Sequence, residues 1–177
     1  MAIKAAGLGP AAFFIYHLAM TASIVVLGAR GRMGQMVLTA CANRIQAGQD
    51  LKVVGAVESP SSPFLGQTSG VDGIEAKVTA DLASLLKPGV VVIDFTSPEA
   101  SMAALEACRK AGAAHVLCTT GLSAAQKQAI ADAAKTIPVV FAPNMSMGVT
   151  IMFRGFKSRW MIFCSCMYAR PSAACSR

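Results

Sequence analysis

The stretch IVVLGARGRMG, from Ile24 to Gly34, most constrains the fold of this chain, because four apolar residues run directly into three glycines spaced three apart. The apolar run predicts a buried strand, and the window after it predicts a helix. Glycine at 28, 31 and 34 supplies the positive φ and the close backbone contact of a tight strand-to-helix turn. The same turn aims the amides of a new helix at an anion such as a diphosphate. A purely structural turn and a dinucleotide site are both open at this point.

Short strand patterns alternate with helical windows along the rest of the chain. Strands are expected at 23–27, 51–57, near 78, and at 90–95, 114–118 and 138–141. Helices are expected at 32–47, 97–112 and 123–135, with a helical turn at 81–86. The composition is 54% apolar and 14% charged, which suits a sheet buried on both faces. The pattern therefore predicts an α/β fold with a Rossmann-like, doubly wound parallel sheet.

The two ends of the chain differ from the body between them. The formal net charge is +7, but five of the sixteen basic residues follow Phe153, where no acidic residue occurs. The nearly balanced remainder argues against a nucleic-acid-binding body. We expect residues 23–149 to form the dinucleotide-binding domain, 1–22 to be an extension outside the fold, and 150–177 to be an aberrant or disordered tail.

The apolar run AAFFIYHLAM in the leader leaves a signal peptide open, but Met20 as the natural start is favoured. The run is shorter than the roughly 20 apolar residues that span a bilayer, so no membrane partner is expected.

Six cysteines are present, and three of them, Cys41, Cys108 and Cys118, lie in apolar segments where a free thiol packs as a small hydrophobe. Cys164 and Cys166 are separated by one residue, which is not a zinc-ligand spacing. We therefore expect no metal site and a reduced, cytoplasmic protein.

The segments with chemical potential follow the strands, where ligands bind in such sheets. Glu58 lies 24 residues after Gly34, near the roughly 20 expected for a carboxylate that binds the adenosine ribose. A solvated loop glutamate is the alternative. Ser59 follows Glu58 where an arginine could bind a 2′-phosphate, so NADH is favoured. Arg30 and Arg32 could supply the missing positive charge, so NADPH remains an alternative.

Five ordered motifs carry a family resemblance: GARGRMG, the acid after VVGAV, VVIDFTSPEA, CTTGLS and APNMSMGV. Together they resemble the N-terminal cofactor domain of the 4-hydroxy-tetrahydrodipicolinate reductase family, which serves lysine and diaminopimelate biosynthesis. The resemblance covers about 24–149. It implies hydride transfer from NAD(H) or NADP(H) to a cyclic dicarboxylate, and a homotetramer in the family.

The resemblance also implies the binding residues. Residues 28–33 would wrap the diphosphate, Glu58 would hold the ribose, and the segments after the later strands would line the nicotinamide site. Thr120 would also meet a substrate carboxylate, and Cys118 stands where the family usually has glycine. The implied cofactor site comprises Gly28, Ala29, Arg30, Gly31, Arg32, Met33, Glu58, Phe95, Thr96, Cys118, Thr119, Thr120, Ala142, Pro143, Asn144 and Met145.

The second, substrate-binding and oligomerisation domain of the family has no counterpart in this sequence. Its His-His pair, its lysine and its Lys-x-Asp-Ala-Pro-Ser-Gly-Thr run are absent, and no catalytic residue is assigned. The two histidines are His17, in the leader, and His115, expected to be a packed strand residue. We expect a truncated and catalytically impaired reductase. Our hypothesis for the change in sequence character after Val149 is a shifted reading frame. The alternatives to this function are a catalytically silent dinucleotide-binding module and another Rossmann-fold dehydrogenase. The alternative for the tail is a genuine basic segment.

Overall fold

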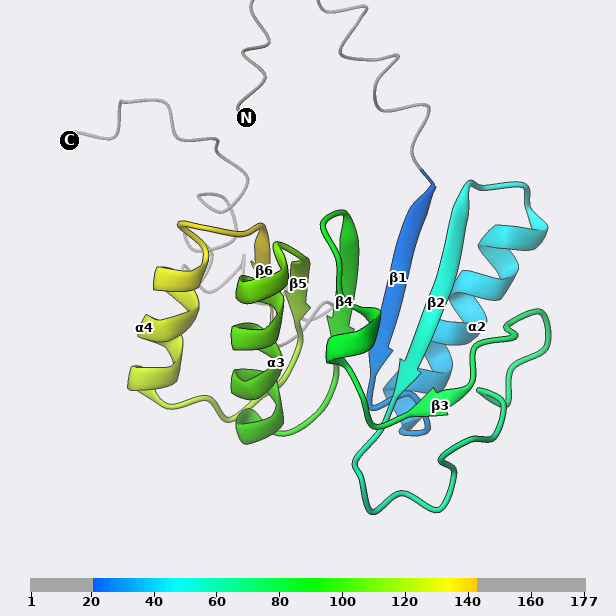
Figure 1. The fold of residues 1–177 in the computed structure, drawn as a ribbon, viewed down its shortest axis with the longest axis horizontal. Coiled ribbons are helices and arrows are strands. Elements are labelled where there is room, and N and C mark those ends of the chain that lie inside the picture. The colour runs from blue at the N-terminus through cyan, green and yellow to red at the C-terminus, as the bar shows by residue number, and fades with distance from the viewer. Residues whose placement is uncertain (1–20, 143–177) are drawn as a thin grey trace, which may run out of the picture.

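The computed structural model describes residues 21–142, which form one parallel sheet with helices packed on it (Figure 1). The strands are β1 (Ala22–Leu27), β2 (Leu51–Val57), β3 (Val78–Thr79), β4 (Val90–Asp94), β5 (Ala114–Leu117) and β6 (Val139–Phe141). The helices are α2 (Arg32–Gln46), α3 (Pro98–Ala111) and α4 (Ala124–Ala133), with a 3₁₀ turn η1 (Ala83–Leu85). Every strand and helix expected within this range is present, with ends that differ by one or two residues.

The sheet has the strand order β3-β2-β1-β4-β5-β6, and every pairing is parallel. The chain builds outward from β1 to β3, then returns to the middle and builds the other half from β4. Strand order therefore reverses between β1 and β4, and a crevice forms at such a point beyond the carboxyl ends of the strands. This arrangement confirms the Rossmann-like, doubly wound fold.

Two apolar cores lie on opposite faces of the sheet. Val25 and Leu27 pack with Leu105 of α3 in one core, whereas Val26, between them in sequence, packs with Leu38 of α2 in the other. Successive strand residues point to opposite faces, so α2 covers one face and α3 and α4 cover the other. Each fully buried side chain of this size stabilises the fold by about 1.5–3 kcal/mol. The continuous apolar strands are thus explained by burial on both faces.

The helices begin in two different ways. Ser97 and Ser123 cap α3 and α4, and Ser123 forms the predicted capping box with Gln126. Helix α2 begins at Gly31, which has no side chain to act as a cap, and its first turn carries no acidic residue. Its first amides have no intrahelical acceptor, and the positive end of its dipole is not compensated by the helix itself.

The three described cysteines are buried free thiols, as expected. Burial, reinforced by the nearby Asp94 charge, raises the pKa of Cys108 to about 12 and that of Cys118 to about 11. Both therefore remain protonated at neutral pH and pack as apolar groups. Between residues 21 and 142, no helix combines the length and apolar character required to cross a bilayer.

Candidate nucleotide-binding site

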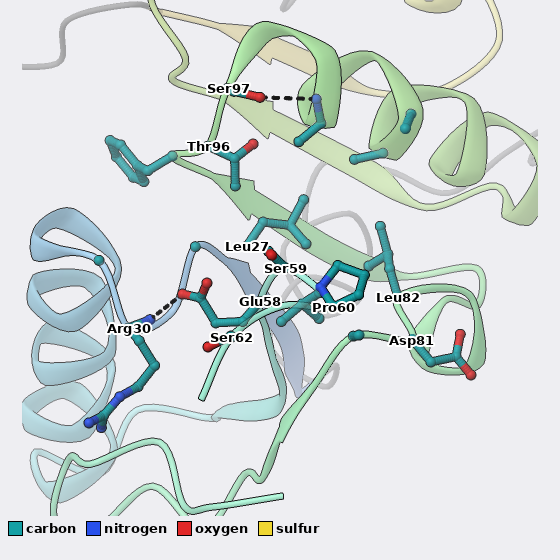
Figure 2. A pocket seen from close by; sticks show the side chains of 18 of the residues that line it. Leu27, Arg30, Glu58, Ser59, Pro60, Ser62, Asp81, Leu82, Thr96 and Ser97 are labelled. Atoms are coloured by element: carbon teal, nitrogen blue, oxygen red, sulfur yellow. Dashed lines mark hydrogen bonds between the residues drawn. The ribbon is translucent and has the colours of Figure 1, made fainter. Parts of the chain in front are cut away.

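A cavity of about 900 Å³ opens at the carboxyl ends of β1, β2 and β4, at the point where strand order reverses. Figure 2 shows that its walls come from different parts of the chain, with Leu27 from β1, Glu58 after β2, Leu82 beside η1 and Thr96 before α3. This volume lies within the range of small-molecule sites, about 300–1,000 Å³. The cavity therefore lies where the sequence predicted a ligand.

The glycine turn between β1 and α2 forms one side of the cavity. Gly28 has φ +70° and donates from its amide to Val57 O at 2.9 Å, which joins the turn to the end of β2. Gly31 N donates to Gly28 O at 3.0 Å and closes the turn. A Cβ on Gly34 would overlap Gly28 O and lie 2.8 Å from Ala29 Cα. Glycine at 34 is thus required for α2 to begin directly against the turn.

Glu58 follows β2 and reaches back to the glycine turn. Its Oε1 accepts a 2.7 Å hydrogen bond from the backbone amide of Arg30. Its own amide donates to Thr79 O at 2.9 Å, which fixes its backbone beside β3. The carboxylate is half-buried on the cavity wall. A ligand hydroxyl at this place would meet an oriented acceptor.

The side chain of Arg30 turns away from Glu58 (Figure 2). Its guanidinium lies 4.2 Å from the centroid of the Phe64 ring, and Nη1 donates to Ser69 O at 3.0 Å. Gln35 Nε2 also donates to Ser69 O, at 2.9 Å, and to Ala29 O, at 2.7 Å. These contacts attach the long loop over 58–73 to the glycine turn. The Arg30 guanidinium is one of the groups that hold the loop in place.

The structure brings six of the sequence-predicted residues together on the cavity wall: Gly28, Arg30, Gly31, Glu58, Phe95 and Thr96. Ala29 is buried within the turn, whereas Arg32 and Met33 are exposed on the first turn of α2. Cys118 and Thr119 are buried behind the Thr96 turn, and Thr120 is exposed. Ala142 donates from its amide to Leu117 O, beside that segment. Pro143, Asn144 and Met145 lie outside the described residues.

Sequence reasoning missed the wall that α3 contributes. Four alanines line the cavity at positions 100, 103, 104 and 107. Positions spaced by three and four residues share one face of a helix, so the pattern PEASMAALEA contained this signal. Small side chains there leave room between α3 and the segment around Leu82.

A buried polar cluster at the ends of β4 and β5 was also missed. Asp94 is fully buried; its Oδ1 accepts from the amide of Thr96 at 2.9 Å and from Thr96 Oγ1 at 2.6 Å, and its Oδ2 lies 3.3 Å from His115 Nε2. Burial raises the pKa of the Asp94 carboxyl, but hydrogen bonds from His115, Ser101 and Thr96 outweigh it, so this pKa lies below its ordinary value. His115 is buried as expected, and its partner is the carboxylate that interrupts the apolar run VVVID.

The fold, the uncapped helix and the carboxylate at the second strand define a Rossmann-type nucleotide-binding domain. The family model described as "Dihydrodipicolinate reductase, N-terminus" matches residues 22–145, and the chain belongs to this family. The chain is 44% identical to a 4-hydroxy-tetrahydrodipicolinate reductase of Nitrosomonas eutropha over 75% of this chain and 49% of that protein. It is 47% identical to one of Dechloromonas aromatica over 74% of this chain and 48% of that protein. The chain thus spans about half the length of the curated relatives it matches.

Solved structures support the fold. The dipicolinate-bound dihydrodipicolinate reductase of Paenisporosarcina sp. TG-14 aligns with a TM-score of 0.60 at 21% identity, over 89% of this chain and 70% of that one. Aspartate semialdehyde dehydrogenase II of Vibrio cholerae aligns with a TM-score of 0.50 at 18% identity, over 71% of this chain and 42% of that one. Likeness at these identities concerns the fold alone, and the family assignment rests on the sequence matches.

Substituting Gly34→Ala should open the glycine turn, because the new methyl would overlap Gly28 O. We expect a loss of about 1–3 kcal/mol in the free energy of unfolding, as for other overpacked sites. We also expect faster hydrogen exchange at the amides of Arg30 and Gly31. Gly48→Ala is the control for the exchange measurement: no atom lies within 4 Å of an added Cβ at Gly48, and the cost there comes from its positive φ alone, whereas Gly34 is helical and its cost is the overlap. Unchanged exchange at both amides in Gly34→Ala would contradict the prediction.

Asp94 should stabilise the protein less as the pH falls. Its pKa in the folded chain lies below the ordinary value of 3.8, so its contribution is present above that pH and is lost as the pH falls through the lower, folded value. In urea unfolding, wild type should exceed Asp94→Asn by more at about pH 7 than at about pH 3. Glu106→Gln, on the exposed face of α3, is the control. An equal gap between wild type and Asp94→Asn at both pH values would refute the assignment.

Proposed function

We propose that this chain is the nicotinamide-dinucleotide-binding part of a 4-hydroxy-tetrahydrodipicolinate reductase. The observation that carries the proposal is the 2.7 Å hydrogen bond from Arg30 N to Glu58 Oε1. It holds a carboxylate beside the turn that begins an uncapped helix, which is the pairing that a ribose and a diphosphate require. The sequence matches to reductases of that name supply the reaction class.

The residues present fit such a cofactor. The amides of Arg32 and Met33 lie in the first turn of α2, where the helix dipole favours negative charge. Gly28 and Gly31 line the cavity without a Cβ, so a diphosphate could approach their backbone closely. Glu58 Oε1 is engaged with Arg30, and Oε2 would accept from a ribose hydroxyl. When bound, the reduced nicotinamide supplies a hydride.

NADH is the coenzyme that we propose. A 2′-phosphate would lie near the Glu58 carboxylate, and like charges at close range repel each other. Ser59 and Pro60 follow Glu58 and carry no compensating charge. Arg30 could supply one only by leaving Phe64 and Ser69 O, to which it is bound.

The nicotinamide end would lie at the turns after β4, β5 and β6. Phe95 and Thr96 would form one wall, and the segments 118–120 and 142–145 the other. Cys118 is only 6% exposed, so its thiol packs into the core and its backbone would face the ring, which is compatible with the glycine usual in the family. Thr120 is exposed, and we propose that its hydroxyl meets a substrate carboxylate.

A second candidate function is binding without turnover. The sequence lacks the His-His pair, the lysine and the Gly-Thr run that the resemblance implies for binding and protonating substrate. His115, the histidine within residues 21–142, is fully buried against Asp94 and is not available to a substrate. We therefore propose that this chain holds the coenzyme but does not reduce substrate efficiently by itself.

Glu58→Ala should weaken NADH binding by about tenfold, because it removes a charged acceptor and frees the Arg30 amide. NADPH should bind wild type more weakly than NADH, and the difference should shrink in Glu58→Ala because the repulsion is removed. Fluorescence titration of both coenzymes measures these affinities. Glu106→Ala is the matched control, since Glu106 pairs with Arg109 on the exposed face of α3. NADPH binding equal to or tighter than NADH in wild type would overturn the coenzyme assignment.

The chain should bind NADH yet show no substrate-dependent oxidation of NADH when it is mixed with the product of dihydrodipicolinate synthase. A full-length reductase of the family, such as that of Dechloromonas aromatica, is the positive control in the same absorbance assay. Measurable turnover by the present chain would show that the missing groups are dispensable. Failure to bind either coenzyme would refute the proposed function itself.

A further inference from the structure

The buried cluster around Asp94 joins two loops that are far apart in sequence. Thr96 follows β4 and Thr119 follows β5, and Ser101 of α3 lies between them. Ser101 Oγ and Thr119 Oγ1 are 2.6 Å apart, and Thr96 Oγ1 and Ser101 Oγ are 3.4 Å apart. Thr119 Oγ1 also lies 3.5 Å from Asp94 Oδ1. Three hydroxyl groups are thus arranged around one carboxylate.

The directions of the hydrogen bonds follow from the charge of Asp94. A carboxylate only accepts, so the single proton of the Thr96 hydroxyl points at Oδ1, as does the Thr96 amide. The Nε2–H tautomer of His115 donates to Oδ2 and leaves no second N–H at Nδ1, which has no partner among the described residues. Asp94 therefore receives donors on both oxygens, and the Thr96 side chain has one orientation.

That orientation shapes the cavity. With its hydroxyl turned inward to Asp94, Thr96 presents its methyl group toward the glycine turn, 3.3 Å from where a Cβ of Gly28 would lie. The same cluster fixes Thr119, directly before the exposed Thr120. Asp94, Ser101 and His115 do not line the cavity themselves. Their effect on a ligand would pass through the two loops.

We propose that Asp94 is a positioning residue that sets the Thr96 and Thr119 loops for the nicotinamide half of the coenzyme. The inference rests on the proposed function, because it assumes that a nicotinamide dinucleotide binds here. Within residues 21–142, Glu58, which would contact the adenosine ribose, has no hydrogen bond to this cluster, and the cluster meets the glycine turn only through the Thr96 methyl beside Gly28. Asp94 should therefore affect the two halves of the ligand unequally.

The experiment compares NADH with ADP-ribose, which lacks the nicotinamide, by calorimetry on the full chain. Asp94→Ala should lower NADH affinity by at least about tenfold and change ADP-ribose affinity by less than about twofold. In Asp94→Asn, the side-chain carbonyl oxygen can still accept from Thr96, and the side-chain amide can donate to His115 Nε2 when the histidine carries its proton on Nδ1. Asp94→Asn should therefore retain most of the NADH affinity that Asp94→Ala loses. Circular dichroism establishes that each variant is folded.

Thr119→Val and Ser101→Ala carry the test if Asp94→Ala does not fold, and each should weaken NADH binding by about threefold or more without affecting ADP-ribose. Thr136→Val is the matched control, because the Thr136 hydroxyl bonds to Ala133 O beyond α4, outside the cluster and the cavity. Equal losses for both ligands, or no loss for NADH in the folded variants, would overturn the inference alone. Wild type that binds neither ligand would overturn the proposed function, and the inference with it.

Discussion

The close approach of Gly28 and Gly34 is the constraint on which the rest of the site depends. An added Cβ at Gly34 would overlap Gly28 O, so α2 begins against the turn only because that position has no side chain. From this approach follow the Gly28 bond to Val57 O and the Arg30 bond to Glu58. One steric requirement thus joins β1, β2 and α2 at a single edge, beside the crevice where strand order reverses.

The two carboxylates at this edge, Asp94 and Glu58, have different surroundings. Asp94 is fully buried and surrounded by donors, so its charge is used inside the protein. Glu58 is half-buried on the cavity wall, and within residues 21–142 its carboxylate accepts a single hydrogen bond, from Arg30 N. A buried charge without hydrogen-bond partners would be strongly unfavourable, so Asp94 must be paired inside the protein. A carboxylate on the wall of a cavity, such as Glu58, can still accept hydrogen bonds from a ligand. This contrast is the basis for proposing Asp94 as a positioning residue and Glu58 as a ribose-binding residue.

The order of strands and helices could be predicted because its signals are local. These signals include apolar runs such as VVVIDF, the N-caps Ser97 and Ser123, and Gly112 after α3. Each of them influences the conformation of only a few neighbouring residues. The positions of Gly28 and Glu58 at the same edge of the sheet could also be predicted, because one β-α-β unit sets the spacing between the glycine turn and the acid. Bounds differed by a residue or two because helix ends depend on hydrogen-bond geometry as well as on residue type.

By itself the sequence determined the fold class, the glycine turn and the family, because these depend on periodicity and on short motifs. The tertiary structure alone decided the orientation of Arg30 toward Phe64, the alanine wall of α3, and the cluster that joins Asp94 to His115 and Thr119. Each of these contacts joins segments separated by many residues. Such contacts exist only once parallel strands bring their carboxyl ends to one edge, and burial then selects which polar groups must be paired.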